Sequence, residues 1–184
     1  MIIYLKDVPQ DYVLAFDIEF DQKDLVQFAG ILLEKVGKNL FAIARSVNQY
    51  VAHKPSYHFQ RYTGLTKKFL TENGIGLKDL AQIVEDVLLE DIPRASLLVV
   101  SHGLKNDRLV LTQNMINITY DPKTLEPIAG YCTFINARRI LKRPNQLKLS
   151  DIAREIGVYP ISKHDAFSDV WSTLAVLSYL KALE

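Results

Sequence analysis

Two carboxylates stand two positions apart at the end of an apolar run near the N-terminus. The run Val-Leu-Ala-Phe at residues 13–16 favours a buried strand, and Asp17 and Glu19 continue it. Successive side chains of a strand point to opposite faces, so both carboxylates project from the same face. Two buried like charges are unfavourable unless a cation binds them, and hard oxygen ligands suit Mg²⁺ or Mn²⁺ better than zinc. The alternative is that the strand ends here and both acids are solvated.

A second group of reactive side chains lies near the C-terminus. Apolar residues recur at helical spacing between Asp165 and Leu180, and Asp165 is suited to capping this helix. His164 then lies just outside the helix, and Asp169 lies one turn into it. An imidazole titrates close to neutrality, so His164 is suited to removing a proton from a water molecule. The alternative is a capping aspartate, a surface histidine and a solvated Asp169.

A third candidate segment follows a short apolar run at residues 97–100. Residues 101–103, Ser-His-Gly, predict a turn after this strand, and Asp107 opens or precedes a helix over residues 108–114. Taken alone, an aspartate at a helix start such as Asp107 usually only complements the positive end of the helix dipole. His102 taken alone is typical of a structural turn residue. Taken in order, three aspartates, a glutamate and a histidine are what a two-metal phosphodiester hydrolase requires.

The elements that must position these side chains are predicted from apolar runs and turns. Residues 12–20, 24–34 and 40–52 favour a three-strand meander, and a strand is expected at 97–100 and another near 130–134. Helices are expected near residues 66–71, 77–89, 108–114, 135–142, 149–156 and 165–181. Antiparallel strands followed by strands that alternate with helices predict an α/β protein with a mixed sheet flanked by helices.

The ordered motifs resemble those of the DEDDh, or DnaQ-like, 3′–5′ exonucleases. Residues 16–19 match a strand carrying DxE, Asp107 after residues 100–102 matches the second motif, and residues 164–169 match HxAxxD. Segments 27–31, 62–66, 132–139 and 149–153 also resemble the family, so the likeness runs from about residue 12 to residue 180.

This resemblance implies a ribonuclease H-like fold and a two-metal mechanism. It implies that two divalent ions, Mg²⁺ or Mn²⁺, are held by Asp17, Glu19, Asp107 and Asp169. It implies that His164 is the general base and that nucleoside 5′-monophosphates are released from the 3′ ends of single-stranded DNA or RNA. It also implies that the terminal nucleotide lies beside Phe20, Thr63, Gly64 and Leu65.

Two departures from the family pattern affect specificity more than chemistry. Phe20 stands where the family often has threonine, and residues 102–103 and 106–107 read His-Gly and Asn-Asp where HN and FD are common. All four carboxylates and the histidine are present, so cleavage is the favoured reading and the preference between DNA and RNA stays open. The alternative is a catalytically inactive relative that binds nucleic acid or a protein.

A metal phosphohydrolase of the HD type is a further alternative, because His164 and Asp165 form an HD pair. That class needs additional metal-binding histidines, and the chain offers only His53, His58 and His102. None of them stands in an HD-like helical context, so this alternative is disfavoured.

Composition is that of one compact domain over residues 1–184. No apolar run approaches the roughly 18 residues of a membrane span, no signal-peptide pattern is present, and the single Cys132 cannot form an internal disulfide. We therefore expect a cytoplasmic protein without a membrane partner. Whether it acts with a polymerase or as a homodimer is left open.

Charge is unevenly distributed along the chain. The formal net charge is only +1, but residues 1–92 carry −3 (10 basic and 13 acidic) and residues 93–184 carry +4 (12 and 8). Between residues 138 and 148 five cations occur without an acid: Arg138, Arg139, Lys142, Arg143 and Lys148. Such a run can contact phosphates, and the alternative is a solvated helix face.

Overall fold

A mixed sheet forms the centre of the computed structural model, which describes residues 1–118, 120–122, 124, 126–143, 147–159 and 164–184. Its strands are β1 (Ile2–Tyr4), β2 (Tyr12–Asp21), β3 (Asp24–Gly37), β4 (Leu40–Val51), β5 (Gly74–Ile75), β6 (Leu97–Ser101) and β7 (Ala129–Cys132). Their order is β1-β4-β3-β2-β6-β7, with β5 beside β4. Strands β2, β3 and β4 form the expected antiparallel meander, and β6 and β7 extend it in parallel. The predicted α/β class is confirmed.

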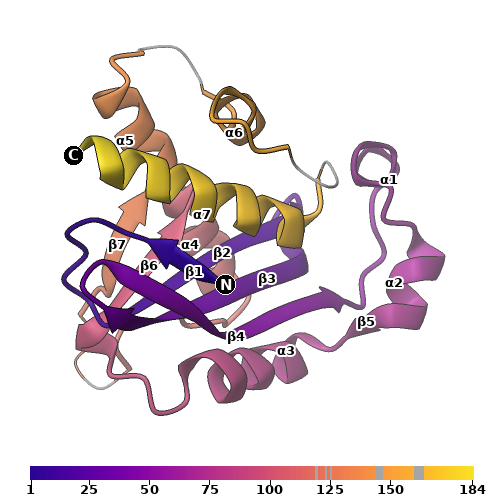
Figure 1. Cartoon of the computed structure of the whole chain (residues 1–184). Coiled ribbons are helices and arrows are strands. Elements are labelled where there is room, and N and C mark those ends of the chain that lie inside the picture. Colours follow the sequence, from indigo (N-terminus) through magenta and orange to yellow (C-terminus); the bar gives the residue numbers. More distant parts are fainter. Residues whose placement is uncertain (119, 123, 125, 144–146, 160–163) are drawn as a thin grey trace.

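Helices cover both faces of this sheet (Figure 1). The α-helices are α1 (Tyr57–Thr63), α2 (Lys67–Asn73), α3 (Leu77–Ile83), α4 (Leu104–Gln113), α5 (Thr133–Ile140), α6 (Leu149–Glu155) and α7 (Ala166–Leu183). A π-helical segment, η1 (Val84–Leu89), continues α3, and a 3₁₀ turn, η2 (Arg94–Ser96), precedes β6. None of the helices in the described part of the chain has both the length and the apolar character needed to cross a membrane.

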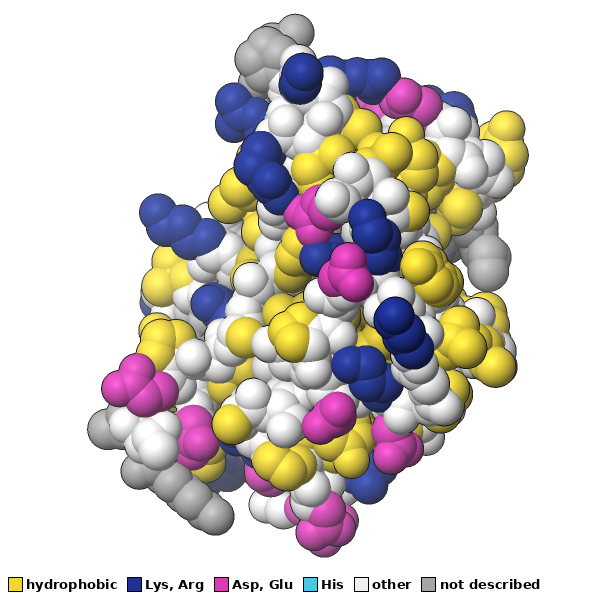
Figure 2. Space-filling model, turned by 60° about the vertical axis from the view of Figure 1, so that its left-hand side comes forward, with side chains coloured by type: hydrophobic (Ala, Val, Ile, Leu, Met, Phe, Trp, Pro, Cys, Tyr) yellow, Lys and Arg dark blue, Asp and Glu magenta, His cyan; other side chains and the backbone are white. Residues whose placement is uncertain are grey.

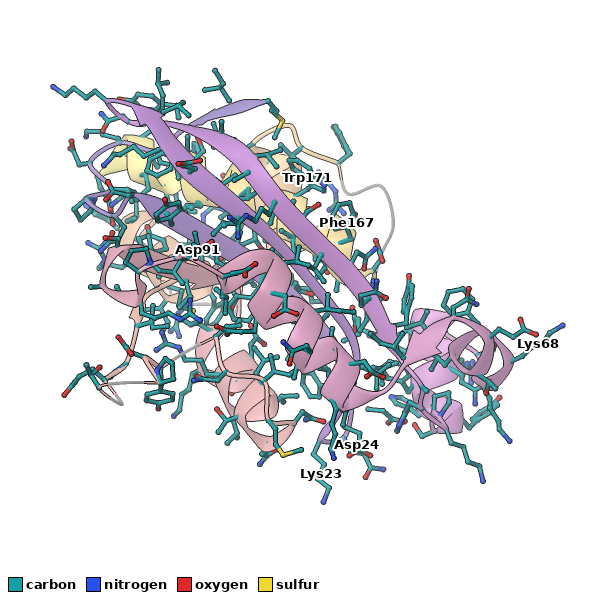
Figure 3. All side chains as sticks on the ribbon, turned by 90° about the horizontal axis from the view of Figure 1, so that it is seen from below. Lys23, Asp24, Lys68, Asp91, Phe167 and Trp171 are labelled. Carbon is teal, nitrogen blue, oxygen red and sulfur yellow. The ribbon has the colours of Figure 1, made fainter. Side chains whose placement is uncertain are left out.

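Alternation along β2 divides the core into two layers. Leu14, Phe16 and Ile18 join a cluster with residues of α3, η1 and α4. Val13 and Ala15 join a second cluster with residues of α7 on the opposite face. In Figure 3, seen from below, α3 lies in front of the strands, and α7 with Phe167 and Trp171 lies behind them. The same alternation places the odd-numbered residues at the end of β2 on the α7 face.

Helices α1 and α2 form an arm that extends beyond the end of the sheet (Figures 1 and 3). A small separate core, with buried Val26, Phe59 and Leu70, attaches this arm to β3 and β4. Asp21 at the end of β2 also anchors it, because its carboxylate accepts hydrogen bonds from the backbone N–H (2.5 Å) and Oγ (2.9 Å) of Ser56. The base of the arm is therefore fixed to the strand that carries the paired carboxylates.

Several boundaries differ from the sequence predictions for identifiable reasons. Helix α4 begins at Leu104, so the prediction that it opens at or after Asp107 is wrong: Gly103 precedes the helix without a side-chain cap. Helix α1 was not predicted, although Ser56 caps it and Gly64 ends it in the left-handed region (φ +80°). Strand β1 was also not predicted, because its three residues gain strand structure only by pairing with β4.

Candidate metal centre

Three carboxylates from two elements converge at the end of β2. Asp17 and Glu19 project from this strand toward α7, and Asp169 projects from the first turn of α7. One oxygen of each lies within 4.8 Å of the other two. This is the same-face pairing that the sequence predicted for β2, with the carboxylate of the predicted C-terminal helix added to it.

Local signals in the sequence explain why α7 begins where it does. The Asp165 side chain accepts a hydrogen bond from the Ser168 N–H at 3.0 Å, which is the N-cap predicted from the sequence. Ala166, Val170 and Leu174 then pack on the sheet in the α7 cluster. The cap and the apolar stripe together direct Asp169 toward β2.

Gln27 of β3 fixes the start of α7 and was not identified as a functional residue from the sequence. Its fully buried side chain donates to Asp165 Oδ1 (2.9 Å) and to Asn48 Oδ1 (3.0 Å), and it accepts from the Ala166 N–H (3.2 Å). It also pairs with Glu19 across the β2–β3 ladder. An amide within the apolar stretch of residues 25–33 was the available signal, because a buried polar side chain requires partners.

Asp107 reaches the same region from α4. It is buried and accepts a hydrogen bond from Ser101 Oγ at 2.5 Å. Burial raises the pKa of this carboxyl. The hydrogen bonds from the Ser101 side chain and the Gly103 backbone lower its pKa by a smaller amount. Asp107 also raises the pKa of Asp17 by repulsion, so the two charges lie close together, but within the described residues Asp107 is outside the group gathered within 4.8 Å.

The electrostatics of the group fit a cation. Burial, followed by repulsion from the neighbouring acids, raises the pKa of all three gathered carboxyls. The pKa of Asp17 lies well above its usual value, the pKa of Glu19 rises to about 7, and the pKa of Asp169 rises to about 6. Among the described residues, no Lys or Arg side chain forms an ion pair with any of the four carboxylates. An all-oxygen donor set with this excess of negative charge suits hard divalent ions such as Mg²⁺ or Mn²⁺.

His164 directly precedes Asp165 at the start of α7, and its ring faces the arm. Its backbone is in the left-handed region (φ +56°), directly before the Asp165 cap. Its ring contacts Tyr62 of α1, with 3.8 Å between the ring centroids and 39° between the planes. Within the described part of the chain, His164 is not one of the side chains gathered within 4.8 Å. Tyr62 stands in segment 62–66, which resembles the family, but no local pattern predicts its contact with His164, because that contact depends on the placement of the arm.

The residues expected beside the terminal nucleotide have identifiable local roles. Phe20 follows Glu19 at a break in the β2–β3 register and is exposed. Thr63 Oγ1 donates to the Phe59 carbonyl (2.9 Å) and accepts from the Leu65 N–H (3.1 Å), while Gly64 ends α1. Leu65 packs against the small core of the arm. These side chains therefore shape the arm, and their contact with a nucleotide stays a prediction.

The remaining histidines and the cysteine lie outside the carboxylate group. His102 bridges Thr133 Oγ1 (2.9 Å) and the Leu147 carbonyl (3.0 Å), and burial lowers its pKa, as suits a structural residue. His53 Nε2 lies 3.5 Å from Asp21. Cys132 is half-buried, and its Sγ contacts the His102 carbonyl oxygen at 3.4 Å. This arrangement gives no support to an HD-type histidine cluster among the described residues.

The fold is shared with solved nuclease structures. Escherichia coli exonuclease I in complex with a dA16 oligonucleotide aligns with 95% of this chain and 42% of its own, at TM-score 0.70 and 18% identity. The cell-death related nuclease 4 aligns over 93% of this chain and 64% of its own, at TM-score 0.68 and 14% identity. The nuclease domain of 3′hExo, a DEDDh family member bound to rAMP, aligns over 94% of this chain and 92% of its own, at TM-score 0.66 and 16% identity.

These likenesses establish the ribonuclease H-like fold of the DEDDh exonucleases. The chain spans about two fifths of the length of E. coli exonuclease I and nearly the whole of the 3′hExo nuclease domain. The sequence matches no protein-family model, and no curated protein is significantly similar to it.

Proposed function

We propose that this chain is a metal-dependent 3′–5′ exonuclease that releases nucleoside 5′-monophosphates from single-stranded DNA or RNA. The observation that carries the proposal is the convergence of Asp17, Glu19 and Asp169 within 4.8 Å. Asp107 adds a fourth carboxylate beside Asp17, and His164 precedes the helix that carries Asp169. We further propose that residues 1–184 act as one nuclease domain in the cytoplasm, where the free thiol of Cys132 is compatible with reducing conditions.

Each residue has a role in this proposal. Asp17, Glu19, Asp107 and Asp169 would hold two divalent ions, Mg²⁺ or Mn²⁺. When bound, such ions acidify an attacking water and stabilise charge on the phosphate and the leaving oxygen. His164 would accept the proton of the water, a role suited to an imidazole side chain. Phe20 would offer an exposed aromatic surface to the terminal nucleotide, and Thr63, Gly64 and Leu65 at the end of α1 would also contact it.

The proposed substrate class is supported by the position of the site and by the solved neighbours. The carboxylate group lies where β2 meets the start of α7, and His164 at the start of this helix contacts Tyr62 of the arm. E. coli exonuclease I was solved with a DNA oligonucleotide and the 3′hExo nuclease domain with rAMP, so we propose a single-stranded nucleic acid without choosing the sugar.

A time course on 5′-labelled single-stranded DNA and RNA of one sequence tests this function. With Mg²⁺ or Mn²⁺ we expect a ladder that shortens from the 3′ end and is absent with Asp17→Ala. The faster substrate would identify the sugar preference. Binding without cleavage of either strand would favour the alternative of a catalytically inactive nucleic-acid-binding relative, and equal cleavage by the variant would refute the site.

A further inference from the structure

A groove of about 680 Å³ lies along α4, on a different face of this helix from Asp107. Residues of one face of α4, spaced three or four apart, line one wall of the groove. Strand β7 and the first turn of α5 line the other wall. Figure 2 shows the side of the molecule that carries β7 and α5, where apolar side chains lie between Lys and Arg side chains. The α4 stripe consists of Leu104, Lys105, Arg108, Leu109 and Thr112.

The polar side chains of this groove favour an anionic ligand. Lys105 and Arg108 line it, none of the described residues of its lining is acidic, and Asn106 and Asn136 add amide groups. Farther along α5, Arg139 is paired with Glu184, so the positive charge of the groove itself comes from Lys105 and Arg108. A ligand that carries negative charge would be attracted to these two cations.

Arg108 is fixed in the wall rather than free in solvent. Its Nη2 donates to the Ile128 carbonyl at 2.8 Å, and its Nε is buried without a hydrogen-bond partner in the described structure. A Cβ at Gly130 would lie 2.6 Å from Nη2, so glycine is what allows the guanidinium to lie against β7. A cation held in place by packing loses little conformational freedom when it binds a ligand.

The apolar part of the groove is unusually exposed for large side chains. Leu109 and Ile135 are each 58% exposed and Tyr120 is 44% exposed. Exposed apolar groups that lie together on a folded protein mark a binding surface more often than scattered ones do. Flat apolar and aromatic surfaces beside cations are what the bases and phosphates of a single strand require.

We propose that this groove binds the single-stranded substrate upstream of the nucleotide that is removed. Phosphates would lie toward Lys105 and Arg108, and bases toward Leu109, Ile135 and Tyr120. Asn106 lines the groove and directly precedes Asp107, so the strand would reach the carboxylates by crossing α4, a helix about 10–12 Å in diameter. The proposal rests on the proposed exonuclease function, and it makes substrate length a determinant of affinity.

Charge reversal of an exposed groove residue tests this binding surface. Lys105→Glu is compared with Lys78→Glu, an equally exposed lysine on α3 outside the groove. Affinity is measured by fluorescence anisotropy on an Asp17→Asn background, which prevents cutting, with a dinucleotide and with a strand of about 16 nucleotides. For Lys105→Glu we expect roughly tenfold weaker binding of the long strand, a smaller salt dependence and unchanged binding of the dinucleotide. Lys78→Glu should alter neither.

A second variant separates the apolar contribution from the charge. Leu109→Ser should weaken binding of the long strand several-fold without changing the salt dependence, and unchanged melting temperatures would show that both variants fold. Unchanged binding of the long strand by both variants would overturn the proposal that the strand binds in this groove. An equal loss of affinity for the dinucleotide and for the long strand would overturn it too. Lys105-dependent binding without cleavage by the unaltered chain would overturn the exonuclease function and leave the groove in place.

Discussion

The rings of His164 and Tyr62 form a contact between the start of α7 and the arm. The imidazole lies against the phenol ring at 3.8 Å between centroids, and its backbone is in the left-handed region, which costs energy for a residue other than glycine. A ring packed against a neighbour has fewer accessible rotamers. At the residue scale, Tyr62 therefore limits where the proposed general base can point.

Replacing His164 should separate catalysis from metal binding. We expect His164→Ala to slow turnover by about 10²–10⁴, the usual contribution of a general base. Its affinity for Mn²⁺ should stay unchanged, because the three gathered ligand oxygens come from other residues. Turnover is measured on a labelled strand, and metal binding is measured by the rise in melting temperature with added Mn²⁺. Equal loss of metal binding in His164→Ala and Asp17→Ala would contradict this division of roles.

Removing the Tyr62 ring should lower kcat more than it changes KM. An aromatic pair contributes about 0.5–1.5 kcal/mol, so we expect Tyr62→Ala to reduce kcat by roughly 2- to 10-fold and Tyr62→Phe to leave it unchanged. Tyr57→Ala is the matched control, because Tyr57 is an exposed tyrosine of the same helix. In a His164→Ala background the Tyr62→Ala change should have no further effect. A rise in KM alone would instead mean that Tyr62 contacts the substrate.

At the element scale, the site depends on the contact between β2, β3 and the start of α7. Strand β2 supplies two carboxylates and α7 supplies one, and Gln27 of β3 connects them by hydrogen bonds to Asp165 and the Ala166 N–H. Because this amide is buried, its loss would leave polar groups without partners.

Gln27→Leu should weaken both the fold and the metal site. Leaving Asp165 and the Ala166 N–H without this partner should lower the free energy of unfolding by about 1–3 kcal/mol, or about 2–4 °C in melting temperature for each kcal/mol. Asp169 would be less well held, so the Mn²⁺-induced rise in melting temperature should be smaller. Gln113→Leu at the exposed end of α4 is the control. Thermal unfolding with and without Mn²⁺ measures both effects, and identical curves for the two variants would refute this role.

Local signals are sufficient for β2 and α7, which carry the three gathered carboxylates, but not for the start of α4 or for the elements around the site. Alternation placed Asp17 and Glu19 on one face, and an N-cap with an apolar stripe defined α7. The bond from Gln27 to Asp165 joins residues 138 positions apart, which no local pattern reveals. The start of α4 was placed too late because its first residues follow an uncapped glycine. The contact between Tyr62 and His164 likewise arises only when the arm is anchored by Asp21.

At the scale of the whole molecule, negative charge is concentrated in the site and positive charge in the second half of the chain. Figure 2 shows Lys and Arg side chains gathered at the top of this face and also across its middle, while most of its Asp and Glu side chains lie in the lower half. A polyanionic strand would be attracted to the basic surface and repelled by the bare carboxylates. Divalent ions would remove that repulsion, so metal and strand should bind with positive coupling.

The stability of the metal-free protein should depend on pH through the same carboxylates. Folding raises the pKa of Glu19 from 4.5 to about 7 and of Asp169 from 3.8 to about 6. The native state therefore holds protons that the unfolded chain releases, and this proton binding adds to the free energy of unfolding. The added stability is fully present below about pH 4 and is lost as pH rises through 6 and 7. Each of the two changes corresponds to about 3 kcal/mol, so we expect a loss of about 3–6 kcal/mol over that interval, measured by denaturant unfolding in the presence of a chelator.

Mn²⁺ should reverse this loss, because it replaces the protons. At pH 8 a concentration near one hundred times the dissociation constant should stabilise the protein by about 2.7 kcal/mol, and at pH 5 by much less. Asp169→Asn removes one charge from the group, so it should stabilise the metal-free protein at pH 8 yet reduce the response to Mn²⁺. Asp11→Asn, an exposed residue before β2, should change neither quantity. If Asp169→Asn were destabilising in chelator at pH 8, repulsion among these carboxylates would not be the dominant energy in the site, and the inference of a built cation centre would lose its main physical support.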